Sequence, residues 1–228
     1  MNLLAFDTST DTLCIAVQRA DALWQHRGPG GAQSSAQLLP AIRRLMDQAG
    51  LEFKALDAIV FGRGPGSFTG LRTACAIAQG LAFGADVPVL PVDTLLAVAE
   101  AARAEHGCTN VVAVLDARMN EVYHAPYSYR DGIWQAAGDA GVCAPEALQV
   151  PAGWSVVGNA LAAYGERLAP GALHLAALPT SAALLRLAPA LLAAHGSQPA
   201  AAALPLYIRD KVAQTTAERA AARLAATP

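Results

Sequence analysis

Hydrophobic positions in the first 30 residues are spaced as in β-strands. Residues 2–7 form a nearly continuous apolar run that ends at an aspartate, and residues 13–18 alternate between apolar and polar side chains. Residues 22–26 carry a third short run, followed by the glycines and proline of residues 28–31. Short runs bounded by turn residues are typical of strands. The chain is therefore predicted to begin with three consecutive strands.

After residue 33 the pattern changes to helical spacing. Between Ser34 and residue 46, apolar side chains recur every three or four positions, which predicts an amphipathic helix with a serine N-cap. Pro40 fits this helix only if the helix begins or bends near it. The order of elements indicates an α/β fold with an antiparallel start. The next predicted elements are a buried, central strand over 57–62, a helix over 71–83, a strand over 87–92 and a helix over 94–105.

The second half of the chain repeats the pattern of the first. A strand over 111–116 again ends in aspartate, and Trp134-Gln135 echoes Trp24-Gln25. We interpret this as a duplication and expect two α/β halves, 1–106 and 107–228, each a mixed sheet flanked by helices. The later predicted elements are a strand over 154–157, a helix after Gly158-Asn159, a helix over 181–195 within the Ala- and Leu-rich region 170–204, and a frayed end beyond Gln214.

Composition excludes several classes of protein. Of 228 residues, 54% are hydrophobic, which is ample for a buried core. Sixteen Lys and Arg stand against eighteen Asp and Glu, so a free-standing nucleic-acid binder is not expected. No window of about 18 uncharged apolar residues predicts a membrane span, and the N-terminus lacks a basic signal-peptide region. Four widely spaced cysteines fit reduced thiols, so we expect a cytoplasmic protein.

Neither a metal site nor a catalytic nucleophile is predicted. No two histidines are four residues apart, and none lies within a cluster of cysteines or acids, so zinc or iron is not expected. No G-x-S-x-G motif is present, and Ser67 has no nearby candidate base. The histidines are His26, His106, His124, His174 and His195.

Asp7 and Asp116 are the first candidates for chemistry, because each ends the first strand of its half. In duplicated folds of the actin and sugar-kinase type, such aspartates face a cleft and can hold a magnesium-bound phosphate. Small residues must then lie beside the aspartate; Thr8 and Ser9 meet this condition, whereas Arg118 is bulky. The alternative is that both aspartates only accept hydrogen bonds from turn amides.

The glycine-rich loop over 62–70 is the second candidate. It is not a P-loop, because G-x-x-x-x-G-K-[ST] is absent and the chain contains only Lys54 and Lys211 as lysines. Pro65 also removes an amide donor that a phosphate cradle would use. The loop is therefore either a plain connection with unusual backbone angles or a device that positions the following helix for a partner.

Four separated motifs in the right order resemble the TsaB (YeaZ) family of bacterial proteins. They are Leu3–Ser9, Phe61–Arg72, Leu115–Tyr123 and Pro205–Ala213. The resemblance implies an actin-like (ribonuclease H-like) fold and a role in making threonylcarbamoyladenosine, the modified adenosine beside the anticodon of tRNA. It further implies a non-catalytic scaffold that binds the transferase TsaD together with the ATPase TsaE, with tRNA contacted only through the complex.

The resemblance also implies which sites are degenerate. The related transferase has two metal-binding histidines four residues apart, and Thr94 and Val98 stand at those positions here, where neither can replace an imidazole. We expect no cofactor, except for a nucleotide at an interface of the complex. The alternative is an active small-molecule kinase or ATPase of the same superfamily; a peptidase has no supporting motif. The degenerate nucleotide cleft would comprise Asp7, Thr8, Ser9, Asp116, Arg118 and Gly158.

Two helices of the first half are the predicted partner surface. The second helix is rich in small residues, and its apolar positions occupy more of its circumference than packing on one sheet requires. Burial in the chain's own core is the alternative. The resemblance favours an interface and implies a homodimer that competes with TsaD for one shared surface. The predicted interface residues are Leu38, Leu39, Ile42, Leu71, Arg72, Ala74, Cys75, Ala78 and Gln79.

Overall fold

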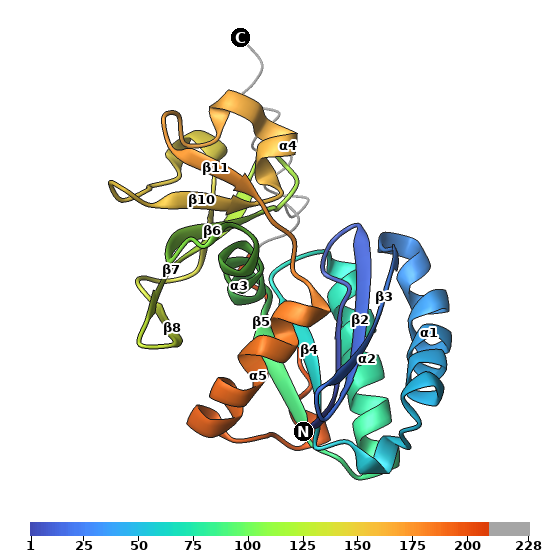
Figure 1. The fold of residues 1–228 in the computed structure, drawn as a ribbon. Helices are drawn as coiled ribbons and strands as arrows, with labels where there is room; N and C mark the ends of the chain where they lie inside the picture. Colours follow the sequence, from blue (N-terminus) through green and yellow to red (C-terminus); the bar gives the residue numbers. More distant parts are fainter. Residues whose placement is uncertain (210–228) are drawn as a thin grey trace.

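The computed structural model describes residues 1–209. They form two mixed β-sheets, which are separated by helices (Figure 1). The predicted fraying beyond Gln214 and the last residues of the 205–213 motif lie outside the described residues. The first sheet has the order β3-β2-β1-β4-β5. Its strands are β1 (Asn2–Asp7), β2 (Thr12–Arg19), β3 (Ala22–Pro29), β4 (Ala58–Gly64) and β5 (Val89–Asp93).

The first sheet is organised around β1, which pairs antiparallel with β2 and parallel with β4. Both faces of β1 are buried, which explains why its sequence is apolar without alternation. β4 is likewise internal, between β1 and β5, as its apolar sequence predicted. The antiparallel start and the order of strands and helices through residue 106 are confirmed.

The second sheet repeats the first in order, which confirms the duplication. Its order is β11-β10-β6-β7-β8, with the short β9 paired to β7, so β6 takes the place of β1. β9 and β11 were not predicted, because they are short and none of their residues is fully buried, unlike those of the equally short β10. The strands are β6 (Asn110–Asp116), β7 (Val122–Arg130), β8 (Ile133–Ala136), β9 (Gly141–Cys143), β10 (Ser155–Gly158) and β11 (Leu173–Ala176).

The helices form two layers around these sheets. One layer, α1 and α2, covers the outer face of the first sheet, and α4 lies against the second sheet. The other layer, α3 and α5, lies between the sheets (Figure 1). α3 packs mainly on the second sheet, whereas α5, which follows β11, returns to the first. The helices are α1 (Ser34–Ala49), α2 (Phe68–Ala85), α3 (Thr94–His106), α4 (Ala160–Tyr164) and α5 (Ser181–His195).

This exchange of helices means that residue 106 separates the strands of the two halves but not their cores. Leu184 of α5 is buried against Leu3 and Val60 of the first sheet. In the same way, Val98 of α3 is buried against Ala113 of the second sheet. Each half therefore buries apolar surface contributed by the other, which stabilises their relative position.

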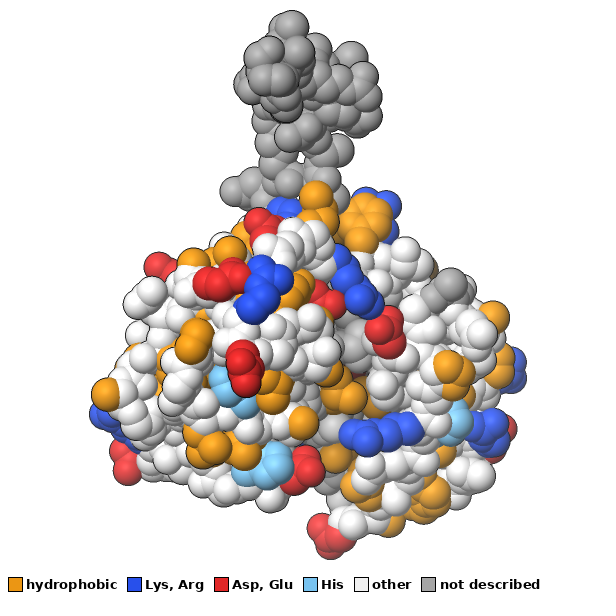
Figure 2. Space-filling view, turned by 90° about the horizontal axis from the view of Figure 1, so that it is seen from above, with side chains coloured by type: hydrophobic (Ala, Val, Ile, Leu, Met, Phe, Trp, Pro, Cys, Tyr) orange, Lys and Arg blue, Asp and Glu red, His pale blue; other side chains and the backbone are white. Residues whose placement is uncertain are grey.

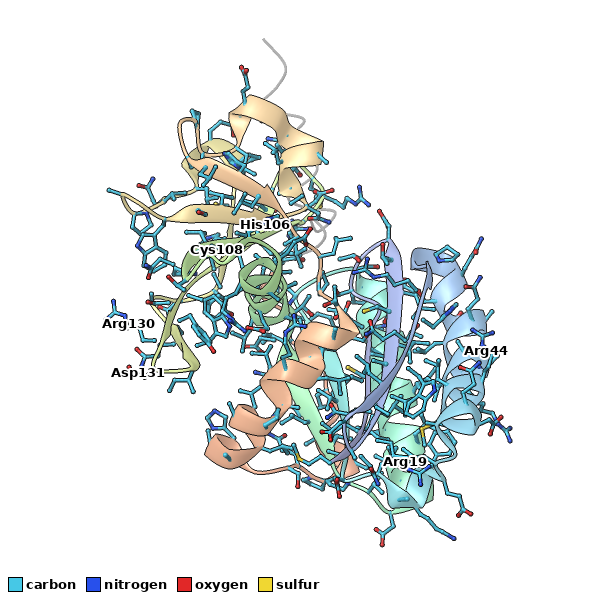
Figure 3. The ribbon with its side chains drawn as sticks, in the orientation of Figure 1. Arg19, Arg44, His106, Cys108, Arg130 and Asp131 are labelled. Carbon is cyan, nitrogen blue, oxygen red and sulfur yellow. The ribbon has the colours of Figure 1, made fainter. Side chains whose placement is uncertain are left out.

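Helix α1 differs from its prediction at its start. Its N-cap is Gln33 rather than Ser34, and the Ser34 hydroxyl is buried without a hydrogen-bond partner in the described residues. Pro40 lies inside the helix. Arg19 of β2 donates to the carbonyl of Ala49 at 3.0 Å, which ties the end of α1 to the sheet; Arg19 is labelled in Figure 3.

None of the helices in residues 1–209 is both long enough and apolar enough to cross a bilayer. The β7–β8 hairpin turns at residues 131–132, and Figure 3 shows Arg130 and Asp131 there, away from the main body of the second sheet. His106 and Cys108, also labelled there, lie where α3 leads into β6.

Candidate functional site

A cleft of about 700 Å³ lies between the two halves, where the ends of β1 and β6 approach each other. The first half contributes the turn after β1 and the glycine loop, and the second half contributes the β6–β7 turn and Asn159. A segment near the C-terminus, residues 206–209, lines the remaining side. Among the predicted cleft residues, Ser9, Asp116 and Arg118 line it.

Asp7 does not line this cleft; its side chain is fully buried. Its Oδ1 accepts hydrogen bonds from the amide and hydroxyl of Ser9 at 2.8 and 2.6 Å, and its Oδ2 accepts one from Thr94 Oγ1 at 3.4 Å. Burial raises the pKa of Asp7 to about 6, although the bonds from Ser9 and Thr94 oppose this shift. The expectation that Asp7 faces the cleft is wrong, because the chain encloses the carboxylate.

The glycine loop is what encloses Asp7 and its neighbours. A Cβ atom at Gly62 would lie 1.8 Å from Asp7 Oδ2, and one at Gly70 would lie 1.9 Å from the Thr8 carbonyl oxygen. The loop therefore approaches the turn after β1 more closely than any other residue type allows. Thr8 Oγ1 donates to the Gly70 carbonyl at 2.7 Å, and the Ser67 amide donates to the Ser9 carbonyl at 2.7 Å. These groups bond to one another and are not free to cradle a phosphate.

Asp116 is more accessible, but its oxygens also have partners within the chain. Oδ1 accepts from the Arg118 amide at 2.8 Å and from the Tyr164 hydroxyl at 2.7 Å. The Arg118 guanidinium lies 3.1 Å from Asp116 Oδ2 and 3.1 Å from Asp11 Oδ2 on the other half. Arg118 thus bridges the cleft between two carboxylates, where the kinase hypothesis would require room for phosphate.

The turn that carries Arg118 has an unusual backbone. Arg118, Met119 and Asn120 have φ values of 59°, 54° and 61°, so three consecutive residues are left-handed. Such conformations cost about 1 to 2 kcal/mol per residue. Position 158 requires glycine, because its φ is 148° and a Cβ there would lie 1.8 Å from the Val114 carbonyl oxygen. Gly158 therefore supports strand packing and does not line the cleft.

Residues 204–209 contact both halves of the protein. They include the start of the last sequence motif, for which the sequence alone predicted no structural role. On the first half, the Leu206 amide donates to the Arg63 carbonyl at 2.7 Å, and the Tyr207 ring stacks on Phe68 with centroids 5.7 Å apart. On the second half, Arg209 donates to the Ala117 carbonyl at 3.1 Å and to the Glu121 carboxylate. We call residues 204–209 the strap. The last of the four motifs is therefore a connection across the cleft.

Arg72 joins the strap to the start of α2. Its guanidinium lies 3.7 Å from the centroid of the Phe68 ring, and its Nε donates to the Tyr207 hydroxyl at 3.1 Å. Phe68 and Tyr207 are 51% and 47% exposed, so this cluster presents aromatic surface to solvent. Neither aromatic residue was in the predicted interface, although both lie in motifs that carried the resemblance.

The structure corrects the predicted partner surface on α1 and α2. Only Leu39, Arg72 and Gln79 of the nine residues are exposed. The other six pack in the chain's own core and offer almost no surface to a second chain; they are Leu38, Ile42, Leu71, Ala74, Cys75 and Ala78. The exposed face of α2 instead carries Phe68, Thr69, Arg72, Ala76, Gln79, Gly80 and Phe83.

The two positions for which the resemblance implies metal-binding histidines in the transferase, Thr94 and Val98, are fully buried here. Thr94 Oγ1 accepts a hydrogen bond from the Gly64 amide at 3.1 Å and donates to Asp7, and Val98 is fully buried in the core of the second sheet. Within residues 1–209, no three His, Cys, Asp or Glu side chains are grouped so that they could hold a metal ion.

Charge on the face that Figure 2 shows is mixed, with Lys and Arg interspersed among Asp and Glu rather than gathered in one patch. This distribution agrees with the small net charge of −2. A protein that binds a nucleic acid directly usually presents a continuous basic surface.

Comparison with known proteins gives one consistent result. The family model of TsaD, tRNA N6-adenosine threonylcarbamoyltransferase, matches residues 26–225. The tRNA threonylcarbamoyladenosine biosynthesis protein TsaB of Haemophilus influenzae is 35% identical, over 93% of this chain and 95% of its own length. TsaB of Escherichia coli K12 is 33% identical, over 93% and 96%. The solved structure of YeaZ from Pseudomonas aeruginosa is 40% identical with a TM-score of 0.84, covering 90% of this chain and 99% of that one.

Proposed function

The chain belongs to the TsaB (YeaZ) family, and we propose that it acts in tRNA threonylcarbamoyladenosine biosynthesis as a non-catalytic subunit that binds the transferase TsaD, together with TsaE. The duplicated actin-like fold is the one this family membership implies. The chain is similar to the transferase family over most of its length.

The enclosure of Asp7 is the observation that carries the non-catalytic assignment. An aspartate that holds a magnesium-bound phosphate must reach solvent or ligand with at least one oxygen. In this chain both oxygens face Ser9 and Thr94, and the glycine loop covers them. The alternative of an active kinase or ATPase would require the loop to withdraw from the turn after β1, which would break the hydrogen bonds at Thr8 and Ser9.

The exposed face of α1 and α2 is the surface that we propose for TsaD. Phe83 is 84% exposed, and Gly80 and Gly84 beside it have no atom within 4 Å of a built Cβ, so a second helix could approach the backbone closely. Leu39 on α1 is 41% exposed. We propose that the same face supports a homodimer, which then competes with TsaD because one apolar surface cannot cover two partners at once.

We further propose that tRNA meets this subunit only through the complex, and that any nucleotide binds at an interface between subunits. The small net charge supports the first point, because counterion release at phosphate contacts requires clustered basic side chains. The bridge from Arg118 to Asp116 and Asp11 supports the second, because it links the two sides of the cleft in the isolated chain.

Reconstitution tests this function directly. The purified chain alone should neither hydrolyse ATP over multiple turnovers nor transfer threonylcarbamoyl to tRNA. Addition of the chain to TsaD, TsaE and threonylcarbamoyl-adenylate should raise the yield of modified tRNA well above that of TsaD and TsaE without it. ATP turnover by the chain alone that disappears in Asp7→Asn would contradict the proposal and favour the kinase hypothesis.

A further inference from the structure

The second half lacks the counterpart of helix α1. In the first half, α1 lies over β2, so Ile15 and Val17 are fully buried beneath it. In the second half, the corresponding interval between β8 and β10 contains only β9 and one 3-10 turn, η3 (Pro145–Ala147). The outer face of β7 is therefore covered by residues 137–154, a segment that contains no α-helix.

A cavity of about 520 Å³ lies at this position. Ladder pairing puts Pro126 opposite Val112 and His124 opposite Val114, so these side chains share the outer face of the second sheet, as Val17 and Ile15 share that of the first. The volume is within the range of about 300 to 1,000 Å³ that is typical of small-molecule sites. Its walls are formed by Val112, His124, Pro126, Ala137, Asp139, Cys143, Ala147, Gln149, Val150, Pro151 and Trp154.

The chemistry of the walls excludes strongly anionic ligands. No Lys or Arg lines the cavity, and its one acidic lining residue, Asp139, is exposed to solvent. Most of the lining is apolar, and it includes one indole and two proline rings, which offer flat surfaces to a planar ligand. The polar groups are few, as in sites where they orient a ligand that apolar contacts hold.

His124 is the polar group best placed to orient such a ligand. Its side chain is partly buried, and neither ring nitrogen has a hydrogen-bond partner among residues 1–209. Burial lowers the pKa of His124, so the imidazole is neutral near pH 7 and offers one donor and one acceptor. Gly141 permits the close approach of the backbone to this ring, because a Cβ there would lie 2.9 Å from Nε2.

We propose that this cavity binds a small, uncharged, planar heteroaromatic ligand of about the size of a nucleobase. Trp154 and Pro126 would contact its faces, and the imidazole of His124 would bond to its polar edge. Asp139 would accept a hydrogen bond from an exocyclic amino group. This inference does not depend on the proposed function, because the cavity lies on the outer side of the second sheet, away from α1, α2 and the cleft.

Indole signals in a ¹⁵N–¹H correlation spectrum provide the test, because the chain contains only three tryptophans. Trp154→Phe assigns the signal of Trp154. Titration with adenine or adenosine should shift this signal saturably, with a Kd on the order of 1 mM for so few ligand atoms, and should leave Trp24 and Trp134 unmoved. Adenosine monophosphate should bind at least about threefold more weakly, since no cation lines the cavity.

Two substitutions of equal size separate binding in the cavity from binding elsewhere. Ala147→Phe fills the cavity and should weaken adenosine binding by about tenfold or more. Ala152→Phe, on a neighbouring exposed position that does not line the cavity, should leave the Kd unchanged. His124→Phe should keep the apolar contacts but weaken adenosine more than it weakens indole, which lacks a ring acceptor. Thermal unfolding of each variant checks that the fold is retained.

The same experiment distinguishes the sources of the ligand. A shift of the Trp154 signal by free adenosine alone would identify a nucleoside site. A shift by a short unpaired RNA, reversed by adenosine, would identify an unstacked base. No saturable shift of Trp154 with any of these molecules, or a shift that Ala147→Phe leaves unaltered, would overturn the proposal. A shift of the Trp154 signal that only a protein partner produces would overturn the proposal as well.

Discussion

The indole Nε1 of Trp134 donates a hydrogen bond to Oε2 of Glu100, 2.9 Å away. Glu100 is only 2% exposed, and it also accepts two hydrogen bonds from Arg103, at 2.8 and 2.9 Å, and one from Arg186 at 2.7 Å. These residues come from β8, α3 and α5. One buried carboxylate therefore connects the edge of the second sheet to both helices that lie between the sheets.

Glu100→Ala should be among the most destabilising single changes in the chain. It would leave two guanidinium groups and an indole N–H without their acceptor, at a cost of about 3 kcal/mol, at the low end for buried pairs because the arginines are partly exposed. Trp134→Phe keeps most of the ring contacts and should cost about 1 to 2 kcal/mol. Urea denaturation measures both. Glu52→Ala, which removes an exposed ion pair with Lys54, is the control and should cause no measurable change.

Asp7→Asn should change how stability depends on pH. Burial raises the pKa of Asp7 from 3.8 to about 6, so between these values the folded state binds more protons than the unfolded state. The free energy of unfolding should therefore fall as pH rises through this window, by about 3 kcal/mol in total. Asn cannot ionise, so the variant should match the wild type near pH 4 and exceed its stability near pH 7.

Denaturation of both proteins at several pH values from 4 to 7 checks this expectation. Asp21→Asn, at an exposed turn, serves as the control and should give a curve parallel to that of the wild type. A wild-type stability that rises relative to Asp7→Asn between pH 4 and 6 would show that the carboxylate is held ionised, as a phosphate or metal site would require.

Substitution by glutamate should have very different effects on stability at two alanines of α2. Ala78 is fully buried, so Ala78→Glu would place an unpaired charge in the core of the first half and unfold the chain or cost several kcal/mol. Ala76 is exposed, so Ala76→Glu should leave the melting temperature nearly unchanged. If the exposed face of α2 binds TsaD, Ala76→Glu should weaken co-purification with TsaD. Full binding by folded Ala76→Glu would remove this position from the interface.

Removal of the Arg209 side chain should destabilise the protein far more than removal of the Arg118 side chain. The Arg209 side chain is 13% exposed and bonds to the Ala117 carbonyl and the Glu121 carboxylate, so Arg209→Ala should cost about 1 to 3 kcal/mol. Hydrogen exchange should then quicken at the amides of residues 117 and 121. Arg118 is 72% exposed, and Arg118→Ala should leave stability within about 0.5 kcal/mol of the wild type. Equal losses of stability in Arg209→Ala and Arg118→Ala would contradict this prediction.

Elements with a strong local pattern were predictable from the sequence. The apolar run that becomes β1 has its predicted bounds, Asn2–Asp7, and the helix predicted over 181–195 is α5. Such segments can be identified from local periodicity, because the spacing of their apolar residues follows from whether one face or both faces of the element are buried. β9 and β11 are short and have no fully buried residue, and they exist because β7 and β10 offer partners for pairing.

The candidate site was predicted less well, since its geometry depends on contacts between distant residues. The sequence by itself determined the strands other than β9 and β11, the duplication and the motifs. Only the tertiary structure decided that Asp7 is enclosed, because Gly62 and Thr94, which cover it, lie 55 and 87 positions away in the sequence. It also decided which side of α2 is core, because small residues allow either face to pack, and the sheet buries Ala74 and Ala78 while leaving Ala76 in solvent.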